Sequence, residues 1–115
     1  MRSGTFAQAL RHAWAGLIYA LATQWNMRVH VVVGFFVLLA AYRLHLGRPA
    51  LLALVLVVAL VIALELVNTA LEAAVDLLSP AEHPLAKAAK DCSAAAVLVA
   101  ALAAVAVGAL AFTGP

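Results

Sequence analysis

The chain has 115 residues, of which 68% are hydrophobic and 10% charged, and its mean hydropathy is +1.12. A soluble domain is nearer half apolar and a quarter charged, and a chain this short cannot bury so much apolar surface in its own core. The net charge of +2, without a basic cluster, excludes a typical nucleic-acid binder. We therefore expect residues 1–115 to form one domain, an all-α membrane protein.

Residues 5–22 predict an amphipathic helix that lies on the membrane surface. Thr5 and Gln8 have the spacing of a capping box, which marks the start of a helix. Polar side chains at Gln8, Arg11 and His12 sit away from an apolar stripe, as in an interfacial helix. The stripe consists of large apolar residues: Phe6, Leu10, Trp14, Leu17 and Leu21.

Three later segments predict membrane-spanning helices, at about 29–46, 50–78 and 85–112. Residues 50–64 include no polar side chain, and residues 92–112 include no charge. The middle segment, with about 29 residues, would be roughly 43 Å long, which exceeds the hydrocarbon thickness of ~30 Å. Its charged end is therefore expected to project from the membrane before the chain turns at Ser79-Pro80.

The positive charges predict the orientation of these spans. One side would collect Arg2, Arg11, Arg28, Lys87 and Lys90, and the other would collect Arg43 and Arg48. Cytoplasmic loops carry the excess of Lys and Arg, so we expect the N-terminus and the loop after residue 78 in the cytoplasm.

A polar stripe on the middle span is the clearest sign of chemistry. Asn68, Glu72 and Asp76 fall within about 60° of Glu65 on either side, so the four share one helix face over roughly 16 Å. An ionisable group inside a span costs ~2.5–3.5 kcal/mol on insertion scales, so such groups are rare unless they have a function. The simpler alternatives are hydrogen bonding between helices for Glu65 and Asn68, and a solvated helix end for Glu72 and Asp76.

The start of the last span carries a matching set of charges. Lys87, Lys90 and Asp91 share one face, and a short loop places that helix antiparallel to the middle span. Carboxylates there can hold a hard divalent cation, and lysines can neutralise phosphate. A Glu at lipid depth suits general-base work on a lipid alcohol. Phosphoryl transfer fits this combination, although no Walker or kinase glycine-rich motif is found.

These residues resemble the prokaryotic diacylglycerol kinase and undecaprenol kinase family. Residues 65–76 read ELVNTALEAAVD, residues 82–91 read EHPLAKAAKD, and residues 26–30 read NMRVH. All three segments are similar to family motifs, and together with the three spans they cover nearly the whole chain.

The resemblance implies an ATP- and Mg²⁺-dependent lipid kinase in a bacterial plasma membrane. It also implies a homotrimeric helical bundle whose active sites are shared between subunits. It makes Glu65 the general base, Glu72 and Gln24 the metal-binding positions, and Asn68 and Asp76 residues that shape the site. The implied nucleotide contacts are His12, Glu82, His83, Lys90 and Asp91, and the implied lipid contacts are Trp14, Asn26 and Arg28.

One position departs from the family pattern. Gln24 stands where a second metal-binding Glu is frequent, and its amide offers an oxygen without a charge. The segments 26–30 and 83–87 look more like the undecaprenol kinase branch, so undecaprenol is the expected acceptor and diacylglycerol the alternative.

Two functions of other classes stay open at this point. A non-catalytic membrane scaffold would accommodate Gln24 and the alanine-rich last span. An ion or proton pathway would explain carboxylates within the membrane. Against a pathway, residues 50–64 and 97–112 lack the ionisable side chains that would continue it.

Overall fold

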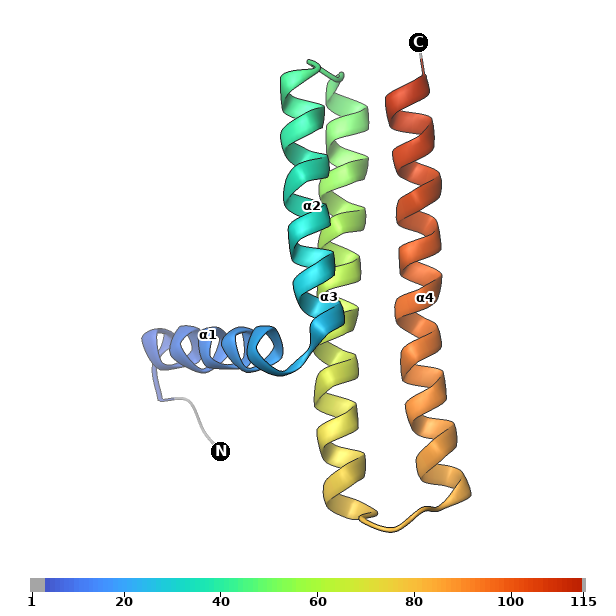
Figure 1. The fold of residues 1–115 in the computed structure, drawn as a ribbon. Helices are drawn as coiled ribbons and strands as arrows, with labels where there is room; N and C mark the ends of the chain where they lie inside the picture. The colour runs from blue at the N-terminus through green and yellow to red at the C-terminus, as the bar shows by residue number, and fades with distance from the viewer. Residues whose placement is uncertain (1–3, 115) are drawn as a thin grey trace.

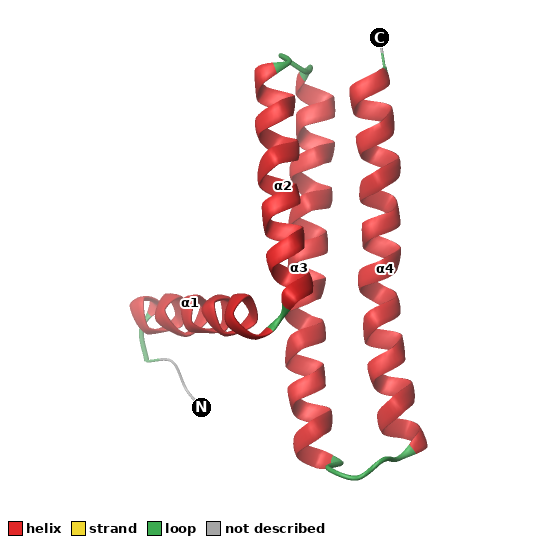
Figure 2. Cartoon of the chain, viewed as in Figure 1, coloured by secondary structure: helices red, strands yellow, loops and turns green. Residues whose placement is uncertain are grey.

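A computed structural model describes residues 4–114, and Arg2 lies outside them. In chain order the helices are α1 (Phe6–Thr23), α2 (Trp25–Arg43), α3 (Arg48–Leu78) and α4 (Pro84–Thr113), and no strand occurs among the described residues (Figures 1 and 2). Helices α2, α3 and α4 are each long and apolar enough to cross a membrane. The all-α expectation with three candidate spans is confirmed.

Helix α1 begins where the capping pattern predicted. The Thr5 hydroxyl accepts a hydrogen bond from the Gln8 backbone N–H at 3.1 Å. The Gln8 side chain reaches back to accept from the backbone N–H of Gly4, at 2.7 Å, rather than from Thr5 itself. The helix then leaves the bundle sideways (Figure 1), and nearly all its side chains are exposed in the single chain. That α1 rests on the membrane surface stays a prediction.

The corner between α1 and α2 is held by Arg28. Gln24 has extended backbone angles and separates the two helices. The guanidinium of Arg28 donates to the backbone carbonyls of Leu21 and Ala22, both at 2.6 Å, so a cation satisfies the free C-terminal carbonyls of α1. Helix α2 therefore begins at Trp25, earlier than the span expected from about residue 29, because the polar residues after Gln24 are helical.

Helices α2 and α3 pack closely in an antiparallel hairpin. His45 has a left-handed φ of 55°. Its N–H bonds to Tyr42 and that of Leu46 to Ala41, which is the Schellman pattern that ends a helix. Lower in the pair, a Cβ added to Gly34 would lie 2.7 Å from Cγ1 of Val58. The missing side chain lets the two helices approach.

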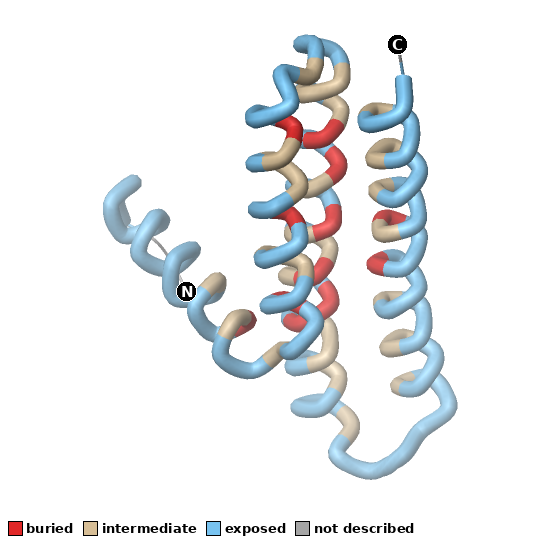
Figure 3. The backbone as a smooth tube through the Cα atoms, turned by 45° about the horizontal axis from the view of Figure 1, so that its top comes forward, coloured by how far each residue is buried: buried red, intermediate tan, exposed pale blue. Residues whose placement is uncertain are grey.

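Helix α3 is the centre of the bundle. It packs against both α2 and α4, whereas α2 and α4 hardly touch each other. Its buried residues form a stripe along the helix (Figure 3). Most large apolar side chains on the other faces are exposed. Surrounding lipid or further copies of the chain must cover them, as the composition indicated. The buried residues of α3 are Leu54, Val57, Val61, Glu65, Asn68 and Thr69.

Contacts between the helices set the depth of each α3 residue. Counting along the antiparallel pair from Gly34 and Val58 places Met27, near the start of α2, level with Glu65. Met27 and Glu65 are both fully buried, which agrees with this alignment. Beyond Glu65, α3 continues for roughly 20 Å past the end of α2, as Figure 1 shows. We call the part of the bundle where α2, α3 and α4 run together the three-helix section. Glu65 lies at one end of it.

Candidate active site

The polar stripe of α3 divides into a buried and a more open half. Glu65 is 2% exposed and Asn68 is 8% exposed, so both belong to the core. Asn68 donates from Nδ2 to Oε1 of Glu72 at 3.4 Å, a long hydrogen bond that joins the halves. Glu72 is half-buried and Asp76 is exposed. Along α3 the stripe therefore runs from a buried carboxylate, Glu65, to a solvent-exposed carboxylate, Asp76.

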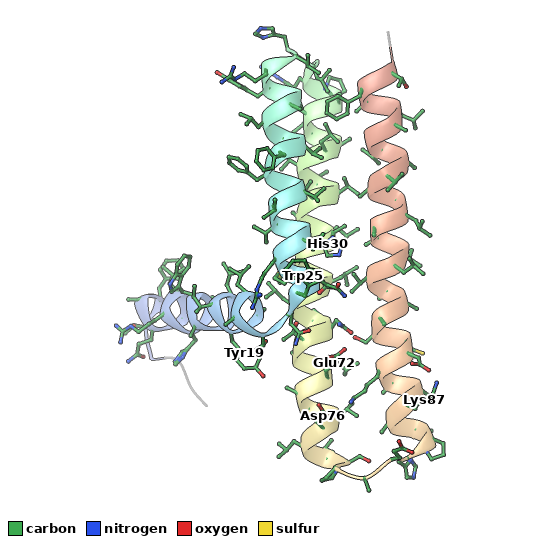
Figure 4. The ribbon with its side chains drawn as sticks, viewed as in Figure 1. Tyr19, Trp25, His30, Glu72, Asp76 and Lys87 are labelled. Carbon is green, nitrogen blue, oxygen red and sulfur yellow. The ribbon has the colours of Figure 1, made fainter. Side chains whose placement is uncertain are left out.

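The carboxylate stripe meets one of the two lysines of α4 that were expected to face it, Lys90. Lys90 Nζ lies 2.5 Å from Asp76 Oδ1 and joins the two helices. Lys87 instead pairs with Asp91 on its own helix at 2.6 Å. Glu72 and Asp76 lie on the part of α3 that runs beside α4 in Figure 4. Both ion pairs are largely exposed, so each can be exchanged for a ligand at little cost in stability.

A cavity of about 780 Å³ lies where α3 ends and α4 begins. It gathers four of the five residues predicted to bind nucleotide, together with Asp76 and Lys87. Its charged and titratable lining residues are Asp76, Glu82, His83, Lys87, Lys90 and Asp91. The volume lies within the range of small-molecule sites.

His83 has a structural role as well. Its Nδ1 accepts from the backbone N–H of Leu85 at 3.1 Å, which caps the N-terminus of α4. Pro84 occupies the first turn, where a missing N–H is tolerated. Since Nδ1 is occupied as an acceptor, Nε2 is the nitrogen left to donate to a ligand.

Several predicted site residues lie apart from this cavity. His12 and Trp14 are exposed on α1, which contacts α2 and α3. Gln24 is the break between α1 and α2, and Arg28 is engaged with the carbonyls of α1. Asn26 is exposed in the first turn of α2. Within one chain, the nucleotide residues of α4 and those of α1 do not form a single site.

The donor set around Glu72 suits a hard cation that completes its shell from elsewhere. Among residues 4–114, no cluster of three His, Cys, Asp or Glu side chains is close enough to hold a metal ion. Asn68 Oδ1, however, is buried without a hydrogen-bond partner one turn from Glu72. Carboxylate and amide oxygens are ligands that Mg²⁺ accepts, and it commonly takes the remainder from water and substrate phosphates.

His30 is a residue whose position the sequence reasoning missed. It was named only within the segment 26–30, without a role, yet it is half-buried on α2 and is a titratable neighbour of Glu65. Figure 4 places it above Glu72, toward the three-helix section. Its place four residues after Asn26, on the face of α2 that meets α3, was the available signal.

Comparison with known proteins gives this arrangement a family. The model of prokaryotic diacylglycerol kinases matches residues 11–112. The chain belongs to this family. Diacylglycerol kinase of Synechocystis is 54% identical over 101 residues, which are 87% of this chain and 58% of that protein. Undecaprenol kinase of Bacillus subtilis is 36% identical over 107 residues, 93% of this chain and 87% of its own length.

A third relative is the diacylglycerol kinase of Pseudomonas aeruginosa. It is 34% identical over 92 residues, which cover 80% of this chain and 75% of that protein. The chain thus spans somewhat more than half of the Synechocystis relative and most of the other two. All three relatives are named as lipid kinases, and their names divide between two lipid acceptors.

Proposed function

We propose that this chain is a membrane lipid kinase that moves the γ-phosphate of ATP to the hydroxyl of a lipid alcohol. One observation supports the proposal most directly. A single helix carries a dry carboxylate, Glu65, at the end of the three-helix section, and carboxylates that face lysines roughly 10–16 Å farther out. This separation by depth matches a reaction between a lipid and a water-soluble phosphate donor.

Glu65 acts as the general base in this proposal. The lipid hydroxyl gives its proton to the Glu65 carboxylate, and its oxygen attacks the γ-phosphorus. The bond from that phosphorus to the bridging oxygen breaks, and ADP leaves with the electron pair. Burial of Glu65 excludes water that would compete for the phosphoryl group.

The nucleotide occupies the cavity between α3 and α4, with its phosphates directed along α3 toward Glu72. Lys90 exchanges Asp76 for a phosphate oxygen, and Nε2 of His83 donates to the nucleotide. Glu82 and Asp91 line the same cavity and accept hydrogen bonds. His12 reaches this site from the α1 of a neighbouring subunit in a homotrimer, since its own α1 lies apart from α4.

Glu72 and the free Oδ1 of Asn68 would hold Mg²⁺, with Gln24 as a neutral oxygen donor in place of a carboxylate. When bound, Mg²⁺ neutralises charge on the transferring phosphates. Asp76 keeps Lys90 in position when the nucleotide is absent. Trp14, Asn26 and Arg28 border the entry of the lipid head group, Arg28 by fixing the corner between α1 and α2.

Undecaprenol is the acceptor that we propose first, because residues 26–30 and 83–87 resemble that branch of the family. Diacylglycerol is the second candidate, favoured by the name of the 54% identical Synechocystis relative. The distribution of Lys and Arg supports a cytoplasmic site in a bacterial plasma membrane, where ATP is available.

Purified protein in mixed micelles, given labelled ATP and Mg²⁺ with either lipid, tests the function. We expect label in the phosphate of undecaprenol or of diacylglycerol, and a loss of more than about a hundredfold in Glu65→Gln, as for removal of a general base. Glu65→Gln should keep the oligomeric state of the wild type, because Gln fills the same volume without a buried charge.

Phosphate on neither lipid would contradict the kinase proposal and favour a scaffold. Phosphorylation that persists in Glu65→Gln would contradict only the role of the base. The exposed carboxylate Glu82 provides the matched control, since Glu82→Gln is expected to raise the KM for ATP and leave kcat close to the wild-type value.

A further inference from the structure

Thr69 is a buried polar residue of α3 that the proposed mechanism does not use. It lies one turn after Glu65 and next to Asn68, on the part of α3 that carries the polar stripe. Its hydroxyl donates to the backbone carbonyl of Glu65 at 2.9 Å. A hydroxyl has one hydrogen and two lone pairs, so the oxygen of Thr69 is left as an acceptor only.

The side chain of Glu65 is the neighbour best placed to use this acceptor. Side chains four residues apart share a helix face, with Cβ atoms about 5–6 Å apart, and the Cα–Cβ bond of Thr69 tilts back toward Glu65. The nearby amide of Asn68 is engaged elsewhere, because its Nδ2 donates to Glu72. Among residues 4–114 no other group donates to the oxygen of Thr69. A donor on the Glu65 side chain would therefore find a free acceptor.

An ionised Glu65 cannot use the Thr69 oxygen, whereas a protonated Glu65 can. A carboxylate has no hydrogen to donate, and a carboxylic acid has one O–H donor. Because Glu65 is fully buried, a newly formed O–H without an acceptor would carry the cost of an unsatisfied polar group. A hydrogen bond that forms only as the proton arrives accelerates the reaction without tightening the binding of either reactant.

We propose that the Thr69 hydroxyl accepts a hydrogen bond from Glu65 once Glu65 has taken the proton of the lipid hydroxyl, which makes Thr69 a positioning residue for the base. The inference rests on the proposed lipid kinase function. As the O–H bond of the lipid breaks, its electron pair stays on the lipid oxygen, which attacks the γ-phosphorus. The proton forms the O–H bond of the Glu65 acid, and the hydrogen bond to the Glu65 carbonyl holds Oγ1 of Thr69 near it.

Two substitutions of Thr69 test this role. Thr69→Val removes the hydroxyl and keeps nearly the same shape, and we expect it to lower kcat about fivefold to tenfold, the effect of one hydrogen bond, without changing the KM for ATP or lipid. Thr69→Ser keeps the hydroxyl and should retain most of the wild-type kcat. Thr113→Val is the matched control, because Thr113 donates to the carbonyl of Ala109 in the same way, near the end of α4. It should leave kcat unchanged.

Stability measurements supply a readout that does not depend on catalysis. The amide introduced by Glu65→Gln is neutral and has N–H donors, so it stands in for the protonated acid. Thr69→Val should therefore lower the equilibrium constant for folding in detergent about fivefold more in the Glu65→Gln background than in the wild type, the effect of one neutral hydrogen bond. Thr113→Val should have the same effect in both backgrounds.

The outcomes separate the role of Thr69 from the function. If the wild type phosphorylates lipid and Thr69→Val either keeps the wild-type kcat or raises a KM instead, Thr69 does not assist the base. An equal loss of stability on Thr69→Val in both backgrounds would show that the hydroxyl only bonds the helix backbone, which also overturns the inference. If the wild type phosphorylates no lipid, the proposed function fails, and the stability measurements still decide whether Thr69 accepts from a neutral side chain at position 65.

Discussion

The residues of the candidate site differ in burial and in their ion pairs, and these differences suit them to different roles. Glu65 and Asn68 are buried and have few partners, whereas Asp76 is exposed, Lys90 is half-exposed, and these two form an ion pair. The exposed pair contributes little to stability, since such pairs exchange readily with water. In the proposed reaction, Lys90 therefore leaves Asp76 for a nucleotide phosphate, which carries more negative charge than one carboxylate.

Substitutions of the two lysines of α4 test whether Lys90 binds the nucleotide. Lys90→Gln should raise the KM for ATP about tenfold or more, the effect of losing one charge-assisted hydrogen bond, with little change in thermal stability. Lys87→Gln is the matched control, because Lys87 pairs with Asp91 on its own helix. ATP kinetics of both variants decide the matter, and an equal rise in KM would show that Lys90 has no special contact.

At the residue scale, spacing along one helix was enough to predict part of the site. The 3.6-residue period places Glu65, Asn68 and Glu72 on one face, whatever packs against them. The bonds of Arg28 to α1 could not be predicted in the same way, because they depend on the direction in which the chain turns at Gln24. The cap formed by His83 and the position of His30 depend equally on contacts outside the local spacing.

Among the elements, the hairpin of α2 and α3 determines the depth of the base. The close approach at Gly34 aligns the two helices so that Met27 covers the level of Glu65. Hydropathy was sufficient to predict both helices, and Pro49 lies in the first turn of α3, where a missing N–H is tolerated. The alignment itself needed the contact at Gly34, which one sequence does not reveal.

Gly34→Ala tests the close approach. Its new Cβ would meet Cγ1 of Val58, a stiff β-branched side chain, so we expect a loss of about 1–3 kcal/mol in stability. Unfolding in detergent measures it, and adding Val58→Ala should restore much of the loss. Gly108→Ala is the control, since a Cβ there meets nothing within 4 Å, and it should be neutral. Equal effects of both alanines would contradict the close contact.

For the whole molecule, the main question is how one chain completes the site. Helix α1 carries His12 away from the nucleotide cavity, and apolar side chains cover most of the bundle surface. The fold of one chain could be predicted from hydropathy, but the partners of its outer surface could not, because those contacts involve no neighbour in the sequence. The homotrimer with shared sites that we propose would account for both features.

Mixing two defective proteins tests shared sites. His12→Ala and Glu65→Gln should each be weak or inactive alone. If α1 of one subunit serves the α3 of another, mixed oligomers form some sites with both residues intact. Activity should then appear on mixing after dissociation and reach its maximum near equal amounts. Mixtures that stay at the level of the parents would show that each chain builds its own site, and full activity in His12→Ala would remove His12 from it.

The continuity of α3 has a consequence for how such a catalyst works. Glu65 and Glu72 are seven residues apart on one uninterrupted helix, about 10 Å along its axis. Because α3 is continuous between them, the distance between the two carboxylates is fixed across the membrane boundary. In the proposed reaction the two reactants move instead: the lipid hydroxyl approaches Glu65, the nucleotide phosphates approach Glu72, and the phosphoryl group is transferred between them.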